Sequence, residues 1–96
     1  MDKTLETLRK TYRLPAESTP ENLELRWSRI ITFDEFTIIA GYSYRRDGNC
    51  HFSAVYKFIT DDHTCEGRVK LVAVSDRQFY DDGHALAWGM NETYHC

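Results

Sequence analysis

The sequence predicts an α+β fold in which one N-terminal helix packs on an antiparallel meander sheet of four or five strands. Apolar residues near the N-terminus recur at spacings of three and four, which is typical of a helix. Over residues 25–74 they recur at every second position instead, and acidic or glycine-containing turns interrupt the pattern. The change of period therefore predicts a helix followed by hairpins.

Composition limits the classes of protein to consider. The chain has 96 residues, a formal net charge of -3 and 42% hydrophobic residues. These values exclude a strongly basic nucleic-acid-coating protein, an acidic nucleic-acid mimic and a disordered tail. No apolar run approaches the roughly 18 residues of a membrane helix, and no signal peptide follows the first methionine. We expect a single domain over residues 1–96 in the cytoplasm, which would be the host cytoplasm for a viral protein.

The N-terminal part is predicted to hold a helix over residues 3–13. Three apolar residues define its buried face: Leu5, Leu8 and Tyr12. Pro15 ends this helix, because the residue before a proline avoids helical backbone angles. Residues 16–18 are then a linker. A second helix start follows at Thr19, where a capping hydroxyl precedes a proline and an acid, and we expect one or two turns there.

The first predicted hairpin turns at residues 34–35. This turn pairs Phe33 with Phe36 and, further along, Trp27 with Tyr42, so that the apolar sides of both strands fall on one face. Arg29 is the exception on that face. We expect it to pair with a carboxylate, to lie at an end of the sheet or to mark a bulge.

The second hairpin is predicted to contain a three-residue loop with Gly48 in the left-handed conformation. This loop pairs Tyr42 with Phe52. The inner face of the third strand then carries Phe52, Ala54, Tyr56 and Phe58. A turn at residues 61–62 leads to the fourth strand, which pairs Cys65 with Phe58 and whose inward residues are Cys65, Gly67, Val69, Leu71 and Ala73.

The C-terminal segment, residues 75–96, is predicted to form a short helix ended by Gly83 and then an edge strand. The strand rests on the alternation of Leu86, Trp88 and Met90. A hairpin turn at residues 81–83 within one longer strand is the alternative. The order of helix and then meander resembles the architecture of cystatin-like and related α+β folds.

The outer face of the predicted sheet is the candidate binding surface. Basic residues outnumber acidic ones there, and an apolar row of Ile30, Ile39 and Val55 crosses its middle. An apolar centre with a basic rim favours docking on an acidic partner. The candidate binding residues are Arg26, Ile30, Ile39, Arg45, Val55, Lys57, Arg68 and Lys70. The apolar row also fits a purely structural role, because β-branched residues suit strands or because the aromatic C-terminal segment covers the row.

Candidate catalytic and metal-binding groups are few. Histidine and cysteine occur in four clusters: Cys50–His51, His63–Thr64–Cys65, His84 and His95–Cys96. Their spacing matches no zinc motif, and an odd number of cysteines without an export signal indicates a reduced thiol state. The paired acids at residues 61–62 and 81–82 are as typical of turns as of acid–base chemistry. We expect no metal, no cofactor and no catalytic residue.

These observations predict a small intracellular protein that binds a larger protein with an acidic patch and acts as an inhibitor or adaptor. Its size and lack of motifs are typical of phage accessory and anti-defence proteins, including anti-CRISPR-like inhibitors. A nucleic-acid-binding module using the same face is the first alternative, although the aromatic residues are predicted to point inward, away from bases. A small His/Cys/Asp metal protein or enzyme is the second. A ligand carrier within the sheet and a homodimer through an edge strand stay open.

Overall fold

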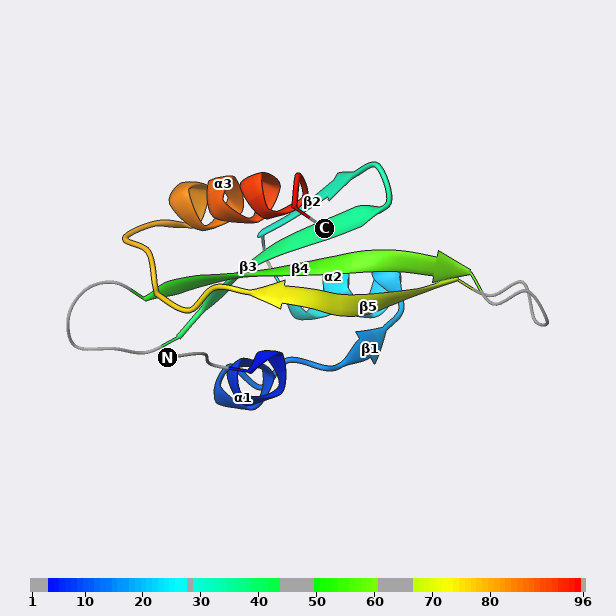
Figure 1. The fold of residues 1–96 in the computed structure, drawn as a ribbon, viewed down its shortest axis with the longest axis horizontal. Coiled ribbons are helices and arrows are strands. Elements are labelled where there is room, and N and C mark those ends of the chain that lie inside the picture. The colour runs from blue at the N-terminus through cyan, green and yellow to red at the C-terminus, as the bar shows by residue number, and fades with distance from the viewer. Residues whose placement is uncertain (1–3, 28, 44–49, 61–66, 96) are drawn as a thin grey trace.

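The computed structural model describes residues 4–27, 29–43, 50–60 and 67–95, and it confirms the α+β class. Its elements are α1 (Leu5–Thr11), β1 (Glu17–Ser18), α2 (Pro20–Arg26), β2 (Arg29–Phe33), β3 (Phe36–Tyr42), β4 (His51–Thr60), β5 (Gly67–Val74) and α3 (Asp82–Glu92). The strands form one antiparallel sheet in the order β1-β5-β4-β3-β2. Helices α1 and α2 cover one side of the sheet, and α3 covers the other (Figure 1).

The predicted four-strand meander is confirmed, but the fifth strand comes from an unexpected part of the chain. Residues 17–18, predicted as a linker, form β1 and pair with Val69 and Lys70 of β5. The short helix predicted to end at Gly83 and the edge strand predicted after it are both wrong, because Gly83 lies in the first turn of α3 and this helix spans Asp82–Glu92. The large residues of this segment alternate as in a strand, but the small residues Ala85 and Gly89 have the spacing of a helix.

The residues that seat α3 on the sheet are Ala85 and Gly89, which lie one turn apart and are both buried. A β-carbon added at Gly89 would overlap Ile38 Cγ2 and come within 2.8 Å of Ser53 Oγ. The helix backbone therefore rests directly on β3 and β4. The helix begins after Asp81, whose side chain accepts a hydrogen bond from the His84 backbone N–H.

The start of the meander also differs from the prediction. The predicted helix start at Thr19 is confirmed, and α2 runs to Arg26 because Leu23 is fully buried against the sheet. Trp27 caps α2 instead of joining a strand, so the predicted Trp27–Tyr42 pair is wrong. The predicted turn is confirmed by the Phe33–Phe36 pair, and β2 pairs with β3 as far as Arg29 and Ala40.

The pairing of β3 with β4 is shifted by one residue from the prediction. Phe52 lies opposite Gly41, and Tyr42 lies opposite His51. A β-carbon at position 41 would overlap the Phe52 ring, so only glycine leaves room for this ring over β3. Because of this shift, Ile39 of β3, predicted to face outward, lies on the same side of the sheet as Ala54 of β4. Both residues belong to the main core. Gly48 lies outside the described residues.

The pairing of β4 with β5 contains a bulge between Val55 and Tyr56. Phe58 pairs with Val69 rather than with Cys65, which lies outside the described residues. Beyond the bulge, the residue of β5 that was predicted to face the main core faces the opposite side of the sheet. The predicted inward position of Ala73 is therefore wrong. Ala73 lies opposite Val55 and packs in the cluster under α3.

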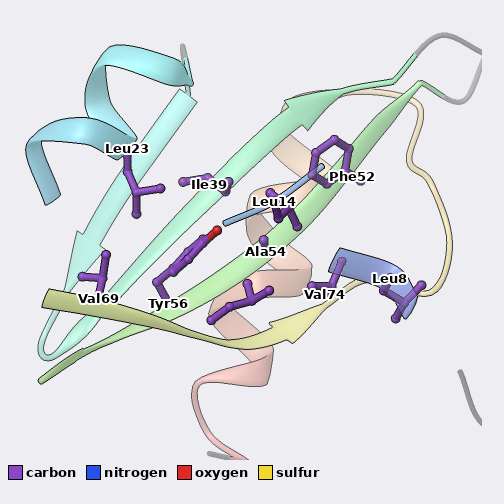
Figure 2. Packing of buried hydrophobic residues seen from close by; sticks show 10 residues of the cluster. Leu8, Leu14, Leu23, Ile39, Phe52, Ala54, Tyr56, Val69 and Val74 are labelled. Atoms are coloured by element: carbon purple, nitrogen blue, oxygen red, sulfur yellow. The ribbon is translucent and has the colours of Figure 1, made fainter. Parts of the chain in front are cut away.

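The main core lies between the sheet and the N-terminal helices. Figure 2 shows this cluster, which spans the sheet from Leu23 of α2 to Leu8 of α1. At its centre Tyr56 is fully buried, and its hydroxyl donates a hydrogen bond to the Pro15 carbonyl at 2.9 Å. Burial raises the pKa of this hydroxyl far above its ordinary value. A smaller cluster under α3 holds Phe36, Ile38 and Val55.

Candidate functional site

The predicted apolar row does not form an exposed surface. Ile39 and Val55 are fully buried, and they belong to the clusters on opposite sides of the sheet. Ile30 is half-buried against the main core. The prediction is wrong because helices cover the central strands on both sides, which the alternating pattern could not distinguish from one covered side.

The basic residues of the predicted surface are divided between two places. Lys57 lies directly opposite Lys70, and Arg68 follows two positions away on the same side of β5. The Lys57 ammonium lies 3.8 Å from Glu35 Oε1, and the Arg68 guanidinium lies 3.5 Å from Glu17 Oε2. Arg26 lies elsewhere, at the end of α2, and Arg45 is outside the described residues. We call the trio of Lys57, Arg68 and Lys70 the basic face.

A cleft of about 430 Å³ opens where α2 ends, close to the start of α3. Figure 1 shows that α3 begins near the end of the sheet at which β4 starts. We call this hollow the tryptophan cleft. Its walls are Arg26, Trp27, Arg29, Ala40, Gly41, Tyr42, His51 and Asp82. The side chains combine positive charge with flat aromatic rings.

The packing of the main core holds Trp27 at this cleft. The Phe52 ring stacks on Tyr12 with centroids 4.1 Å apart, and Trp27 meets its edge at 5.7 Å and 87°. The missing side chain of Gly41 gives Trp27 as well as Phe52 its place over β3. The position of the indole therefore depends on buried residues rather than on an exposed loop.

The cleft holds two arginines and one aspartate, so its formal charge is positive. Arg29 Nε lies 2.6 Å from Asp82 Oδ2, which joins the start of β2 to the first turn of α3. The expectation that Arg29 pairs with a carboxylate is confirmed. Arg26 donates a hydrogen bond to the Arg13 carbonyl at 2.9 Å, and its guanidinium lies 5.5 Å from the centroid of the Trp27 ring. Among the described residues no carboxylate pairs with Arg26 within 4.0 Å, so its charge is available to an anion.

Two buried polar atoms of the cleft residues have no hydrogen-bond partner within the described part of the chain. They are the Trp27 indole Nε1 and His51 Nδ1. Burial of an unpaired donor or acceptor costs about 1–3 kcal/mol, so most such atoms in folded proteins have a partner. The Tyr42 ring meets the His51 ring edge-on at 5.4 Å, and Tyr42 is 60% exposed. A ligand with hydrogen-bonding groups and a flat ring would match this lining.

The other histidine and acidic motifs have structural surroundings. His84 Nδ1 lies 2.7 Å from Asp81 Oδ1, at the cap of α3. His63, Cys65 and Cys96 lie outside the described residues. Over residues 4–27, 29–43, 50–60 and 67–95, no three His, Cys, Asp or Glu side chains gather closely enough to hold a metal ion. None of the described helices has the length and apolar character needed to cross a membrane.

The Asp81 cap predicts a pH dependence of stability. Hydrogen bonds from the His84 backbone and side chain hold the pKa of Asp81 below its ordinary value of 3.8. A carboxyl whose pKa is lower in the folded state stabilises the fold above its unfolded pKa and loses this effect as the pH falls through its folded pKa. We expect the free energy of unfolding to decline below pH 3.8, and to decline less in Asp81→Asn, which keeps a capping oxygen. Urea titrations across this pH range measure both slopes, and equal slopes would contradict the prediction.

The comparisons with known proteins bear on the part of the chain that forms the cleft. The family model described as nucleotide modification associated domain 4 (Nmad4) matches residues 14–93. The chain belongs to the Nmad4 family. The match leaves out α1 but includes α2, the whole sheet and α3, and therefore every residue of the tryptophan cleft in this Nmad4 domain. No curated protein and no solved structure matches the chain.

Sequence patterns alone do not reveal most of this Nmad4 cleft. They predict that Trp27 and Tyr42 point inward as a cross-strand pair, whereas both residues line an open hollow. They also place Arg26 on the same face as the other basic residues. One signal points to the site: Arg29 breaks the apolar pattern of its strand, and this arginine joins β2 to α3, two of the elements that line the cleft.

Proposed function

We propose that this Nmad4 domain is a binding module of a nucleotide-modification system and that its tryptophan cleft holds a nucleotide. The observation that carries the proposal is the combination, in one cleft, of an arginine without a carboxylate partner, the exposed ring of Tyr42, and two further rings whose buried nitrogens also lack a partner among the described residues. A nucleotide offers matching groups: an anionic phosphate, a flat base and polar edges. The family description, nucleotide modification associated domain, supports the same ligand class.

We assign this module a role in binding rather than in catalysis. Asp82 is the acid of the cleft, and its carboxylate is held by Arg29 at 2.6 Å. This contact favours a structural role for Asp82 in joining β2 to α3. Arg26 is the group that we expect to contact the phosphate, while Trp27 and Tyr42 contact the base.

The test is calorimetric titration with thymidine 5′-monophosphate. We expect Arg26→Gln to weaken binding about tenfold or more, because it removes a charge-assisted hydrogen bond to phosphate. Arg68→Gln is the matched control, since this arginine is also exposed but does not line the cleft. Equal affinities of wild type and Arg26→Gln, or loss of binding in Arg68→Gln alone, would contradict the proposal.

Protein docking through the basic face is a second proposed function, in which the domain is an inhibitor or adaptor. Lys57 and Lys70 lie directly opposite each other, and like charges at such positions repel. An acidic partner would relieve this repulsion. On the same side of the sheet, Ile31 and Ile59 are 37% and 40% exposed and could supply apolar contact.

This second function predicts a response to charge reversal. The double variant Lys57→Glu with Lys70→Glu should lose a stoichiometric protein that the wild type captures from lysate after nuclease treatment. Arg26→Gln should retain that protein, because Arg26 lies outside the basic face. Equal capture by the folded double variant would reject docking through this face.

A further inference from the structure

A second hollow, of about 550 Å³, lies next to the tryptophan cleft. It runs between residues 77–80 and α3, where its lining extends from His84 to Asn91, and we call it the tyrosine groove. Its lining includes Arg77, Gln78, Phe79, Tyr80, His84 and Trp88. Nothing in the function proposed for the tryptophan cleft uses these residues.

The linings of the two hollows meet at neighbouring residues. His51, which lines the tryptophan cleft, forms a β-bridge with Phe79, which lines the tyrosine groove. Their backbones exchange hydrogen bonds of 3.1 and 2.6 Å. Asp82 and His84 both lie in the first turn of α3, but residues two positions apart point to opposite sides of a helix, so the first lines the cleft and the second lines the groove. The bridge therefore places one residue of each lining side by side, so the two hollows are adjacent.

The groove has the same combination of charge and aromatic rings as the cleft. The Arg77 guanidinium lies 5.5 Å from the centroid of the Phe79 ring, and Phe79 and Trp88 lie 6.5 Å apart at 47°. Tyr80 is 77% exposed, so its ring is available for stacking. Arginine beside exposed aromatic rings is typical of sites that bind unpaired bases.

Gln78 adds a group that can recognise hydrogen-bonding patterns. Its amide Nε2 and Oε1 are both buried, and neither has a partner among the described residues. An amide presents one donor side and one acceptor side, and the exposed edge of a nucleobase offers complementary groups. Rotation of the Gln78 side chain would turn this amide toward the groove. A base bound there would then supply the hydrogen-bond partners that the amide lacks.

We propose that the tyrosine groove accepts a second base, so that the ligand of this domain is a single strand of nucleic acid rather than a free nucleotide. This inference rests on the function proposed for the tryptophan cleft. A free nucleotide fills only one of the two adjacent hollows. Paired bases in a duplex cannot stack on side chains, so only an unpaired strand can contact aromatic rings in both.

The experiment compares the affinities of the whole chain for thymidine 5′-monophosphate, a thymidine dinucleotide carrying a 5′-phosphate, and a hairpin duplex without overhangs. We expect the dinucleotide to bind about tenfold more tightly than the mononucleotide, as one stacked base typically contributes. Tyr80→Ala should remove this gain and leave mononucleotide binding unchanged. Tyr94→Ala is the matched control, because Tyr94 is equally exposed at 77% and does not line the groove.

The outcomes separate the two proposals. Mononucleotide binding without a gain for the dinucleotide, or a gain that Tyr80→Ala leaves intact, would overturn the single-strand inference alone. Equal affinity for the hairpin duplex would overturn it as well. Absence of binding to all three ligands would overturn the function proposed for the tryptophan cleft and this inference with it.

Discussion

Replacing Phe52 with alanine is expected to lower the free energy of unfolding by about 3–5 kcal/mol, a large fraction of the 5–15 kcal/mol typical of small domains. Phe52 is 1% exposed and lies over Gly41, between the rings of Tyr12 and Trp27. Its removal would leave a cavity in the main core and withdraw the support of Trp27. Urea unfolding followed by circular dichroism measures the effect.

A conservative variant at the same position serves as the control. Phe52→Leu should cost less, because leucine fills part of the same volume. Both variants should shift the fluorescence of Trp27, and Phe52→Leu should weaken nucleotide binding while the protein stays folded. A loss below about 1 kcal/mol for Phe52→Ala would show that Phe52 contributes little to the packing of the main core.

Substitution of Gly89 by alanine is expected to destabilise the protein by about 1–3 kcal/mol, although alanine is the better helix former. The added β-carbon would overlap Ile38 Cγ2, so α3 must move away from β3. Because Arg29 is held by Asp82 at the start of the same helix, this movement should also disturb the tryptophan cleft.

Gly83 in the same helix provides the matched control. Among the described residues, a β-carbon there would meet only Asp81 Oδ1, at 3.5 Å, which is ordinary contact. Gly83→Ala should therefore stabilise the protein, by up to about 1 kcal/mol. Thermal unfolding of the two variants should show shifts of opposite sign. Stabilisation by Gly89→Ala would contradict the direct seating of α3 on the sheet.

The meander can be predicted from the sequence because the alternation of apolar residues and the turn residues are local signals. The turn between β2 and β3 and the end of β5 at Val74 follow from them directly. The one-residue register of β3 with β4 does not, because it depends on Gly41 accommodating the Phe52 ring from another strand. A space left by a missing side chain produces no periodic pattern.

The sequence pattern does not predict the helix α3, for a related reason. The alternating pattern gives weight to large residues such as Leu86 and Trp88, whereas the closest contacts with the sheet are made by Ala85 and Gly89. Once α3 covers the second side of the sheet, Val55 is buried and the expected apolar surface disappears. The tryptophan cleft then follows from the ends of α2, β2 and α3, which only tertiary packing brings together.

The measurement that most directly tests nucleotide binding in the tryptophan cleft is a nuclear magnetic resonance titration of the two tryptophan indole N–H groups with thymidine 5′-monophosphate. Trp27 lines the tryptophan cleft and Trp88 the tyrosine groove, so the two signals report on separate hollows. Trp27→Phe assigns the resonances by removing one of them. We expect the mononucleotide to move the Trp27 indole signal in a saturable manner. A titration that leaves the Trp27 signal in place, or moves only that of Trp88, would contradict nucleotide binding in this cleft.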